Sequence, residues 1–282
     1  MLPGLFVLLW STGFIGAKLG LPYIEPATFL EVRFLLVLAL LLPACWLSGA
    51  PWPSGKVAVA QAVSGALLQA GYLGGVFAAI YHGMPAGLSA LITGLQPLLT
   101  AWLAAWLLKE QVSSRQWVGL ALGLGGVLLV VGERVALTGM PFIAVALAAL
   151  ALASISLGTV WQKRHGGAVD LRTGAAIQFM AAAVVLAPFS LLLESRRIEW
   201  TGHLAFAMGW LVLVLSLGAI FLLLYLIRHG GTTQVASLFY LVPPTTALIA
   251  WPLFGETYSA VSLAGMGVAV LAVWLANPRK AS

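Results

Sequence analysis

Long apolar stretches follow one another along almost the whole chain and are separated by short polar connections. Crossing the hydrocarbon core of a bilayer takes about 20 apolar residues in an α-helix. The stretches are continuous rather than alternating with period two, which argues against a membrane β-barrel. We predict an all-α integral membrane protein with ten transmembrane helices, over residues 3–20, 27–47, 57–81, 85–107, 116–132, 141–162, 171–193, 204–227, 232–254 and 259–276. Weak boundaries near 52–56 and 194–203 leave nine or eleven helices open.

The composition supports the membrane interpretation. The chain has 282 residues, of which 61% are hydrophobic and 8% charged, and its mean hydropathy is +1.03. A soluble globular protein carries about 25% charged residues. The net charge of +6 comes from basic residues scattered singly between apolar runs, so we expect no nucleic-acid partner. The single cysteine, Cys45, excludes an intramolecular disulfide and a cysteine-based metal cluster, and we expect no metal and no cofactor.

Lysines and arginines predict the orientation, because they concentrate in cytoplasmic loops. With the N-terminus inside, nine of them fall on the inner side: Lys56, Lys109, Arg115, Lys163, Arg164, Arg172, Arg228, Arg279 and Lys280. The remaining five are Lys18, Arg33, Arg134, Arg196 and Arg197, two of which lie within or near predicted helices. This bias places both termini in the cytoplasm.

The two halves of the chain carry matching proline and charged positions. Pro97 is followed 13 residues later by Glu110, and Pro243 is followed 13 residues later by Glu256. Because each half holds five predicted helices, the second half enters the membrane from the opposite face. We therefore expect two inverted-topology repeats, over 1–135 and 139–278, with the substrate bound near the midplane between them. Further matching pairs are Lys18 with Lys163, His82 with His229, Gly13 with Gly158, and Phe34 with Phe179.

Together these features resemble the EamA family of the drug/metabolite transporter superfamily. The resemblance covers essentially the whole chain and rests on Trp10, Ser11, Phe14, Lys18, Arg33, Phe34, Pro97, Glu110 and the duplicated set in the second half. It implies a ten-helix carrier of small metabolites with five-plus-five inverted repeats and both termini cytoplasmic, in the bacterial inner membrane. Within the family the chain is similar to the YddG-type exporters of aromatic amino acids.

Candidate substrate contacts are aromatic and neutral polar side chains within or at the ends of the predicted helices. Aromatic faces can stack on a ring, and hydroxyl and amide groups can bind amino and carboxylate groups. The residues that we select are Tyr81, His82, Gln96, Trp102, Trp161, Ser237 and Tyr240. Other candidates for the walls are Trp10, Ser11, Tyr72, Thr93, Trp106, Ser156, Gln162, Gln178, Tyr225, Thr245 and Thr246. Contacts between helices or an aromatic belt remain an alternative role for each of them.

Prolines and lysines are the candidates for hinges and gates. Proline removes a backbone hydrogen bond, so Pro97 and the pair Pro243 and Pro244 should interrupt their helices at matching positions. Lys18 and Lys163 end the first and sixth predicted helices and could act as gates or snorkel to the interface. Glu31 and Arg33 stay open between an interfacial pair or snorkelling groups and a role in the pathway or a gate.

These patterns favour a secondary transporter over other classes. The only acid within a predicted helix, Glu31, lies near its end, so we do not expect tight cation coupling. No acid–base or metal-binding cluster suggests an enzyme. A carrier for nucleotides, sugars or vitamins and a channel or scramblase-like pore remain alternatives to amino-acid export. Glycines at 119, 123, 125, 126, 265 and 267 permit close helix contacts, either within the chain or in a homodimer through the fifth and tenth helices.

Overall fold

The computed structural model describes residues 2–109, 113–167, 169–219, 222 and 238–276. Helices make up nearly all of this part, and the one β-bridge in it joins Ile24 and Ile198. The helices are α1 (Leu2–Gly20), α2 (Pro26–Leu47), α3 (Gly55–Gly65), η1 (Ala66–Gly71), α4 (Tyr72–Tyr81), α5 (Ala86–Thr93), α6 (Gln96–Leu108), α7 (Ser114–Thr138), α8 (Phe142–His165), α9 (Leu171–Leu192), α10 (Gly202–Gly209), η2 (Trp210–Ala219), η3 (Phe239–Leu241), α13 (Val242–Phe254) and α14 (Ala260–Ala276).

Eight helical segments of the described chain are long and apolar enough to span a membrane, and two further apolar helices are shorter. Three of the long segments are composite: α3, η1 and α4 form one, α5 and α6 another, and α10 with η2 a third. The prediction of an all-helical membrane protein is therefore confirmed. Residues outside the described ranges include most of the C-terminal part of the predicted helix 204–227 and the N-terminal part of the predicted helix 232–254.

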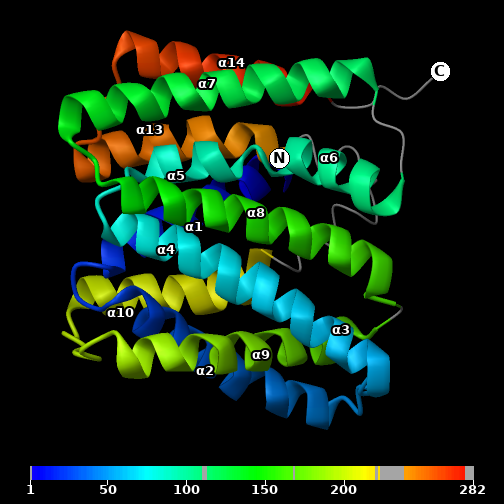
Figure 1. Ribbon diagram of the computed structural model, residues 1–282. Helices are drawn as coiled ribbons and strands as arrows, with labels where there is room; N and C mark the ends of the chain where they lie inside the picture. Colours follow the sequence, from blue (N-terminus) through cyan, green and yellow to red (C-terminus); the bar gives the residue numbers. More distant parts are fainter. Residues whose placement is uncertain (1, 110–112, 168, 220–221, 223–237, 277–282) are drawn as a thin grey trace.

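The helices lie side by side in one bundle whose connections gather at two opposite ends (Figure 1). We call them the N-terminal end, toward which the start of α1 points and where α2, α6, α8 and α14 finish, and the Glu256 end, where α1, α4, α7, α9 and α13 finish. Helices α7 and α14 pack together along one edge of the bundle, and α2 and α9 lie at the opposite edge. Helices α1, α4, α5, α8 and α13 lie between these edges.

Aromatic side chains pack between α2, α4 and α9. Phe29, Phe34 and Phe77 are fully or almost fully buried. The ring of Phe77 meets Phe29 edge to face at 5.2 Å, and Phe34 lies 5.5 Å from Phe179 of α9. Such ring pairs are worth about 0.5–1.5 kcal/mol beyond the area they bury. They join α2 to α4 and α9 by packing.

Within the described residues, four interruptions break the regular α-helical pattern. Helix α5 ends at Thr93 and α6 begins at Gln96, with Pro97 in its first turn; Pro243 holds the same place in α13, which follows the 3₁₀ turn η3. Segments η1 and η2 are π-helical. The sequence pattern predicted the breaks at Pro97 and Pro243 but not the π-helical segments.

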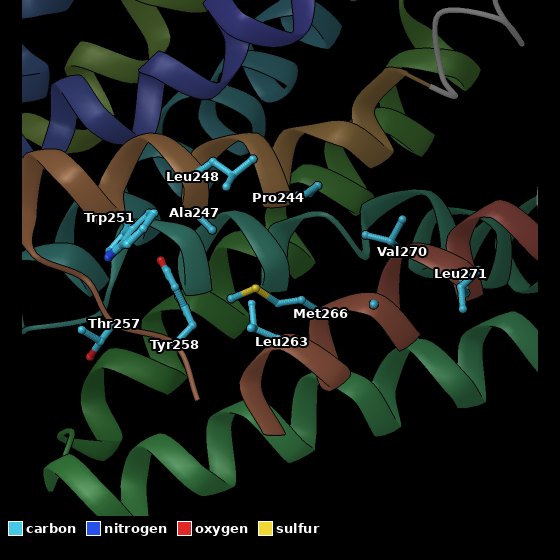
Figure 2. Close-up of a pocket in the computed structure, with 11 residues that line it drawn as sticks. Pro244, Ala247, Leu248, Trp251, Thr257, Tyr258, Leu263, Met266, Val270 and Leu271 are labelled. Atoms are coloured by element: carbon cyan, nitrogen blue, oxygen red, sulfur yellow. The ribbon is translucent and has the colours of Figure 1, made fainter. Parts of the chain in front are cut away.

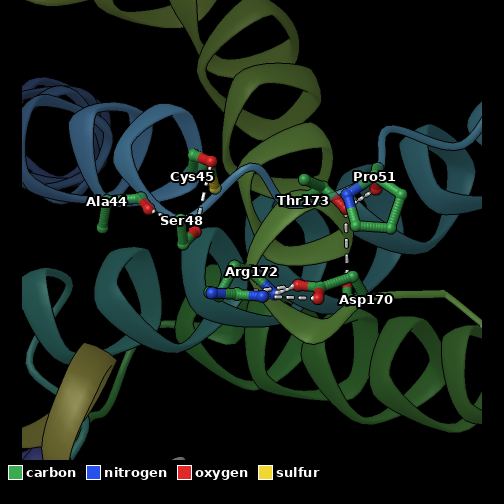
Figure 3. A network of polar contacts seen from close by, with 7 residues as sticks. All are labelled: Ala44, Cys45, Ser48, Pro51, Asp170, Arg172 and Thr173. Atoms are coloured by element: carbon green, nitrogen blue, oxygen red, sulfur yellow. Dashed lines mark hydrogen bonds and ion pairs between the residues drawn. The ribbon is translucent and has the colours of Figure 1, made fainter.

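A polar network joins α9 to the connection between α2 and α3 at the N-terminal end (Figure 3). Asp170 caps α9 by accepting from the Arg172 backbone N–H at 2.9 Å, and its carboxylate also binds the Arg172 guanidinium. The hydroxyl of Thr173 donates to the Pro51 carbonyl at 2.9 Å. The hydrogen bonds from Arg172 lower the pKa of Asp170 to about 2, so this cap stays charged at neutral pH.

Glycines allow α7 and α14 to approach through their backbones. A Cβ atom on Gly126 would lie 2.6 Å from the Gly265 carbonyl oxygen, and one on Gly265 would lie 2.5 Å from Val130. These glycines are therefore used in a contact within the chain. Gly125 and Gly267 have no atoms near the Cβ position, so a homodimer face on the outer side of these helices stays a prediction.

Replacing Gly126 with alanine should lower the melting temperature of the purified protein. The new methyl group would overlap the Gly265 backbone, and overpacking of this kind costs about 1–3 kcal/mol. Gly125→Ala is the matched control, because the same methyl group enters open space and alanine favours the helix by up to about 1 kcal/mol. Thermal unfolding followed by tryptophan fluorescence measures both, and equal melting temperatures would contradict the backbone contact.

Candidate functional site

A cavity of about 480 Å³ lies in the middle of the bundle, between helices from both halves of the chain. This volume lies within the range of about 300–1,000 Å³ that is typical of small-molecule sites. The cavity is lined by Trp10, Gly13, Phe14, Arg33, Leu68, Gln69, Tyr72, Leu73, Val76, Phe77, Ala90, Thr93, Gly94, Gln96, Pro97, Ile155, Thr159, Gln162, Gln178, Phe179, Leu215, Ser216, Phe239, Val242 and Pro243.

All four helix interruptions border this cavity. The break between α5 and α6 contributes Gly94 and Pro97, and the start of α13 contributes Pro243. The π-helical segments contribute Gln69 and Ser216. Irregular backbone is tolerated at membrane depth where it lies within protein or lines a cavity. The interruptions therefore coincide with the cavity and are not scattered along the helices.

Neutral polar groups and aromatic rings lie among aliphatic side chains on the cavity wall. The Gln96 side-chain amide donates to the Thr159 hydroxyl at 3.1 Å, which links α6 to α8. The Trp10 and Phe239 rings meet edge to face with centroids 5.1 Å apart. Arg33 is the only charged residue among the described lining residues, and they include no Asp or Glu. This wall can bind a small molecule with one apolar and one polar part.

The structure places some of the predicted contact residues on this cavity. Gln96 lines it, together with the hinge candidates Pro97 and Pro243. Pro244 lines a different pocket. The other candidate wall residues that line the cavity are Trp10, Tyr72, Thr93, Gln162 and Gln178.

Four further candidates lie elsewhere in this conformation. Tyr81 and His82 are exposed at the Glu256 end and contact each other edge to face at 5.6 Å. Trp102 is 39% exposed on α6. The Trp161 indole donates to the Ala60 carbonyl at 3.1 Å and so ties α8 to α3. Ser237 lies outside the described residues, as does the side chain of Tyr240, whose backbone belongs to η3.

Lys18 forms an ion pair that connects three helices at the Glu256 end. Its ammonium group lies 2.5 Å from the Glu256 carboxylate, which is 4% exposed. The same carboxylate accepts from the backbone N–H groups of Ala86 and Gly87, at 2.7 and 3.4 Å, and from the Tyr258 hydroxyl at 2.5 Å. Glu256 therefore caps α5 from 170 residues away and holds the end of α1 and the end of α13 against it.

The charge state of Glu256 follows from these contacts. Burial raises the pKa of its carboxyl, but hydrogen bonds from Lys18, Tyr258 and the Ala86 amide outweigh burial, so the pKa lies below its ordinary value. Burial and the neighbouring carboxylate raise the pKa of Tyr258, which therefore keeps its proton. At neutral pH the cluster holds one carboxylate, one ammonium group and one neutral phenol.

A second carboxylate ties the two halves together at the same end. Glu194, in the connection after α9, accepts from the backbone N–H groups of Ala27 and Thr28 and from the Thr28 hydroxyl, each at 2.7 Å. Beside it, Ser195 donates to Glu25 at 2.7 Å. Helices α2 and α5 thus both receive their N-terminal caps from distant parts of the chain.

Buried side chains separate the central cavity from the Glu256 end. Phe77 lines the cavity, and Phe29 packs against it one layer further on. Ala17 and Ile80 are also buried between the cavity and the loops. Together with the Glu256 and Glu194 contacts, this layer closes the described bundle at that end.

Glu31 and Arg33 do not form the interfacial pair that was one of the two expectations from the sequence. Glu31 accepts from the Ser190 hydroxyl at 2.5 Å, whereas Arg33 donates to Ser216 and is only 7% exposed. Snorkelling is therefore the wrong interpretation for Arg33, because its charged group points into the bundle. At the N-terminal end, the other lysine candidate, Lys163, lies exposed in the last turn of α8.

A second pocket lies between α13 and α14 and has a different character (Figure 2). Its volume is about 790 Å³, and most of its lining is apolar, including Trp251, Leu263 and Met266. Leu248, Trp251 and Leu263 are more than half exposed, as expected for side chains that face lipid. A hydrophobic groove without convergent polar groups is a poor site for a polar metabolite.

Sequence reasoning missed two parts of the site: the partner of Lys18 and three polar residues of the cavity lining. Glu256 was placed in a loop, and its pairing with Lys18 joins residues 238 positions apart. Gln69, Thr159 and Ser216 were not selected, because single polar residues in apolar helices are common. The duplication of Lys18 and Glu256 as Lys163 and Glu110 was a usable signal for the first of these.

Comparison with known proteins gives consistent results over most of the chain. The sequence profile of the EamA-like transporter family matches residues 4–132 and again 142–277. The chain is 30% identical over 269 residues to the "Uncharacterized inner membrane transporter YedA" of Escherichia coli K12, covering 95% of this chain and 87% of that protein.

Two further similarities agree with this match. The chain is 28% identical over 282 residues to the "Probable amino-acid metabolite efflux pump" of Salmonella typhimurium LT2, covering 93% of this chain and 88% of that protein. One solved crystal structure shares the fold with a TM-score of 0.65 at 21% identity, over 98% of this chain and 95% of the other.

Glu256→Gln should lower the free energy of unfolding by about 1–3 kcal/mol, because it removes the charge that binds Lys18 and caps α5. The folded pKa of Glu256 lies below the ordinary value of 4.5, so the carboxylate stabilises the protein fully above pH 4.5 and progressively less as the pH falls through the lowered pKa. The loss should be constant between pH 6 and 8 and shrink below about pH 4.5.

The control for this variant is Glu199→Gln at the same end of the bundle. Glu199 is 53% exposed and pairs with Arg197 at 3.4 Å, so the change should cost less than about 1 kcal/mol. Thermal unfolding at each pH measures both variants. Equal effects of the two would show that the Glu256 contacts contribute no more than a surface pair.

Proposed function

The chain belongs to the EamA-like transporter family, and from this premise we propose that it is a secondary carrier that exports small metabolites, with amino acids as its substrates. The proposed mechanism is alternating access around the central cavity. The observation that carries the proposal is a cavity in the middle of the bundle, bordered by interrupted helices from both halves of a multi-pass membrane protein. The name of the Salmonella relative supports amino acids, and the aromatic wall favours neutral or aromatic ones.

We further propose that the ten predicted helices form two inverted repeats, 1–135 and 139–278. Two separate matches of the family profile support this division. The irregular features support it as well: α6 begins at Gln96 and α13 at Val242, 146 positions later. Lys109 and Gly255, also 146 positions apart, both end their helices in the left-handed conformation.

The proposed orientation has both termini in the cytoplasm of a bacterium, with the chain in the inner membrane. The excess of Lys and Arg at the N-terminal end supports it. The Glu256 end would then face outward, and the described structure is closed on that side. Substrate would accordingly reach the cavity from the cytoplasm before export.

Release of substrate would require the Glu256 end to open. Three contacts would have to separate: the Lys18–Glu256 pair, the cap on α5 and the Phe29–Phe77 contact. The short helices on either side of the breaks at Pro97 and Pro243 would move as separate bodies. The sequence counterparts of Lys18 and Glu256 are Lys163 and Glu110, so we propose that a second pair takes over at the N-terminal end. Glu110 lies outside the described residues.

Flux through the purified protein in liposomes tests the proposed function. Labelled phenylalanine and threonine should enter in a saturable manner and faster when unlabelled substrate is present on the other side, because a carrier returns faster when loaded. Little dependence on a pH gradient is expected, since the described cavity lining has no carboxylate. Non-saturating flux would favour a pore, and uptake of only a nucleotide, sugar or vitamin would overturn the amino-acid assignment.

Thr159→Trp should reduce this flux at least tenfold, because the larger ring would fill the cavity beside Gln96. The matched control is Leu157→Trp on the same helix, where the side chain is 38% exposed and does not line the cavity. Initial rates in liposomes, normalised to protein content, measure both variants. Similar initial rates for the two variants would show that the cavity is not part of the transport pathway.

Locking the Glu256 end should also stop transport. In a Cys45→Ser background, Lys18→Cys and Glu256→Cys can be joined through two disulfide bonds by a short bis-methanethiosulfonate reagent, since the native side chains meet at 2.5 Å. Flux should be lost on cross-linking and return on reduction. The Cys45→Ser parent treated with the same reagent is the control. Undiminished flux in the cross-linked protein would exclude opening at this end.

A further inference from the structure

Arg33 lies inside the bundle and lines the central cavity. It is about two turns into α2, and its side chain is 7% exposed. An arginine keeps its positive charge in proteins. Burying such a charge costs several kcal/mol unless opposite charges or hydrogen bonds compensate. The role of the Arg33 charge therefore depends on which groups compensate it.

The described neighbours satisfy only part of the guanidinium group. Its Nε and Nη2 atoms donate to the Ser216 hydroxyl at 3.3 and 3.0 Å. That hydroxyl is uncharged and itself donates to the Leu211 carbonyl at 3.0 Å. Of the five N–H groups that a guanidinium offers, two are used in this way. Within the described part of the chain, Nη1 has no hydrogen-bond acceptor.

The carboxylates near Arg33 in the sequence are committed to other contacts. Glu31 accepts from Ser190, and Glu25 accepts from Ser195 at the Glu256 end. No Asp or Glu belongs to the described lining of the cavity. The buried cation thus faces a chamber whose other described lining residues are uncharged: amides, hydroxyls, aliphatic side chains, and rings such as Trp10 and Phe239.

We propose that Arg33 binds an anionic group of the transported substrate, so that the carrier selects metabolites with a carboxylate or another oxyanion over their neutral amides. A guanidinium binds two oxygens of such a group through parallel N–H donors. Ser216 is the positioning residue, because it holds Nε and one Nη2 hydrogen from the π-helical segment and leaves Nη1 for the substrate. This inference rests on the proposed function, since it assigns a substrate class to the same cavity.

Binding to the full-length protein in detergent tests the inference without relying on flux. The probes are L-phenylalanine, L-phenylalaninamide and inorganic phosphate, and the readout is the concentration dependence of the melting temperature. The wild type should be stabilised by phenylalanine, through its carboxylate, or by phosphate at concentrations tenfold or more below those needed for the amide. Arg33→Gln should abolish that difference, and Arg33→Lys should retain part of it. Ser216→Ala should weaken anion binding while leaving amide binding unchanged.

Lys56→Gln is the control for removing one positive charge, because Lys56 is exposed at the start of α3 and outside the cavity. Its preference for the anion should equal that of the wild type. If Arg33→Gln does not fold, Arg33→Lys and Ser216→Ala decide the question alone. An unchanged acid-to-amide ratio in the folded Arg33 and Ser216 variants would overturn the inference, as would equal binding of acid and amide by the wild type.

The failure of this inference and that of the proposed function give different results. Saturable phenylalanine flux that Arg33→Gln leaves unchanged would support the proposed carrier function and contradict the anion-binding role of Arg33. Arg33-dependent binding of phosphate without phenylalanine binding would support the anion-binding role of Arg33. It would also replace amino acids by phosphate esters as the proposed substrate class.

Discussion

A backbone N–H or C=O group left without a partner in hydrocarbon costs several kcal/mol, and this constraint governs where the chain leaves regular α-helix. The breaks before Pro97 and Pro243 and the segments η1 and η2 all border the central cavity. At the Glu256 end, distant carboxylates accept from the first N–H groups of helices, as Glu256 does for α5. The irregular backbone is therefore concentrated around the cavity, and the carboxylate caps are concentrated at one end of the bundle.

The charged residues that join or line the bundle have distinct environments. Lys18 and Glu256 satisfy each other where three helices meet, and Glu194 satisfies the start of α2. Both contacts join residues from opposite halves of the chain, so they hold the halves together at one end. Arg33 differs, because its described partner is a neutral hydroxyl and it faces the cavity. In a protein with so few charges, that contrast distinguishes residues that hold the bundle together from one that can bind a ligand.

Much of the fold was predictable because a membrane imposes a strong pattern on sequence. The first seven predicted helices agree with the described ones to within a few residues at most ends, and proline chemistry located the breaks at Pro97 and Pro243. The π-helical segments were not predictable, because an i→i+5 turn has the same apolar composition as an α-turn. Trp161 shows why the cavity wall was only partly predictable: its indole satisfies the Ala60 carbonyl instead of facing the cavity, and hydropathy does not report which side of a helix faces inward.

The π-helical segment η1 has a consequence for how relatives of this chain should be aligned. A π-turn accommodates one residue more than an α-turn, and each residue of an α-helix turns the chain by about 100°. Deleting one residue between Ala66 and Gly71 could restore a regular α-helix, but it would rotate everything on one side of the deletion by that angle relative to the other. Tyr72, which now lines the cavity, would then exchange its side of the helix with a neighbour. A one-residue gap here in an alignment of relatives would therefore change which residues face the cavity. It would leave the hydropathy profile of the helix nearly unchanged.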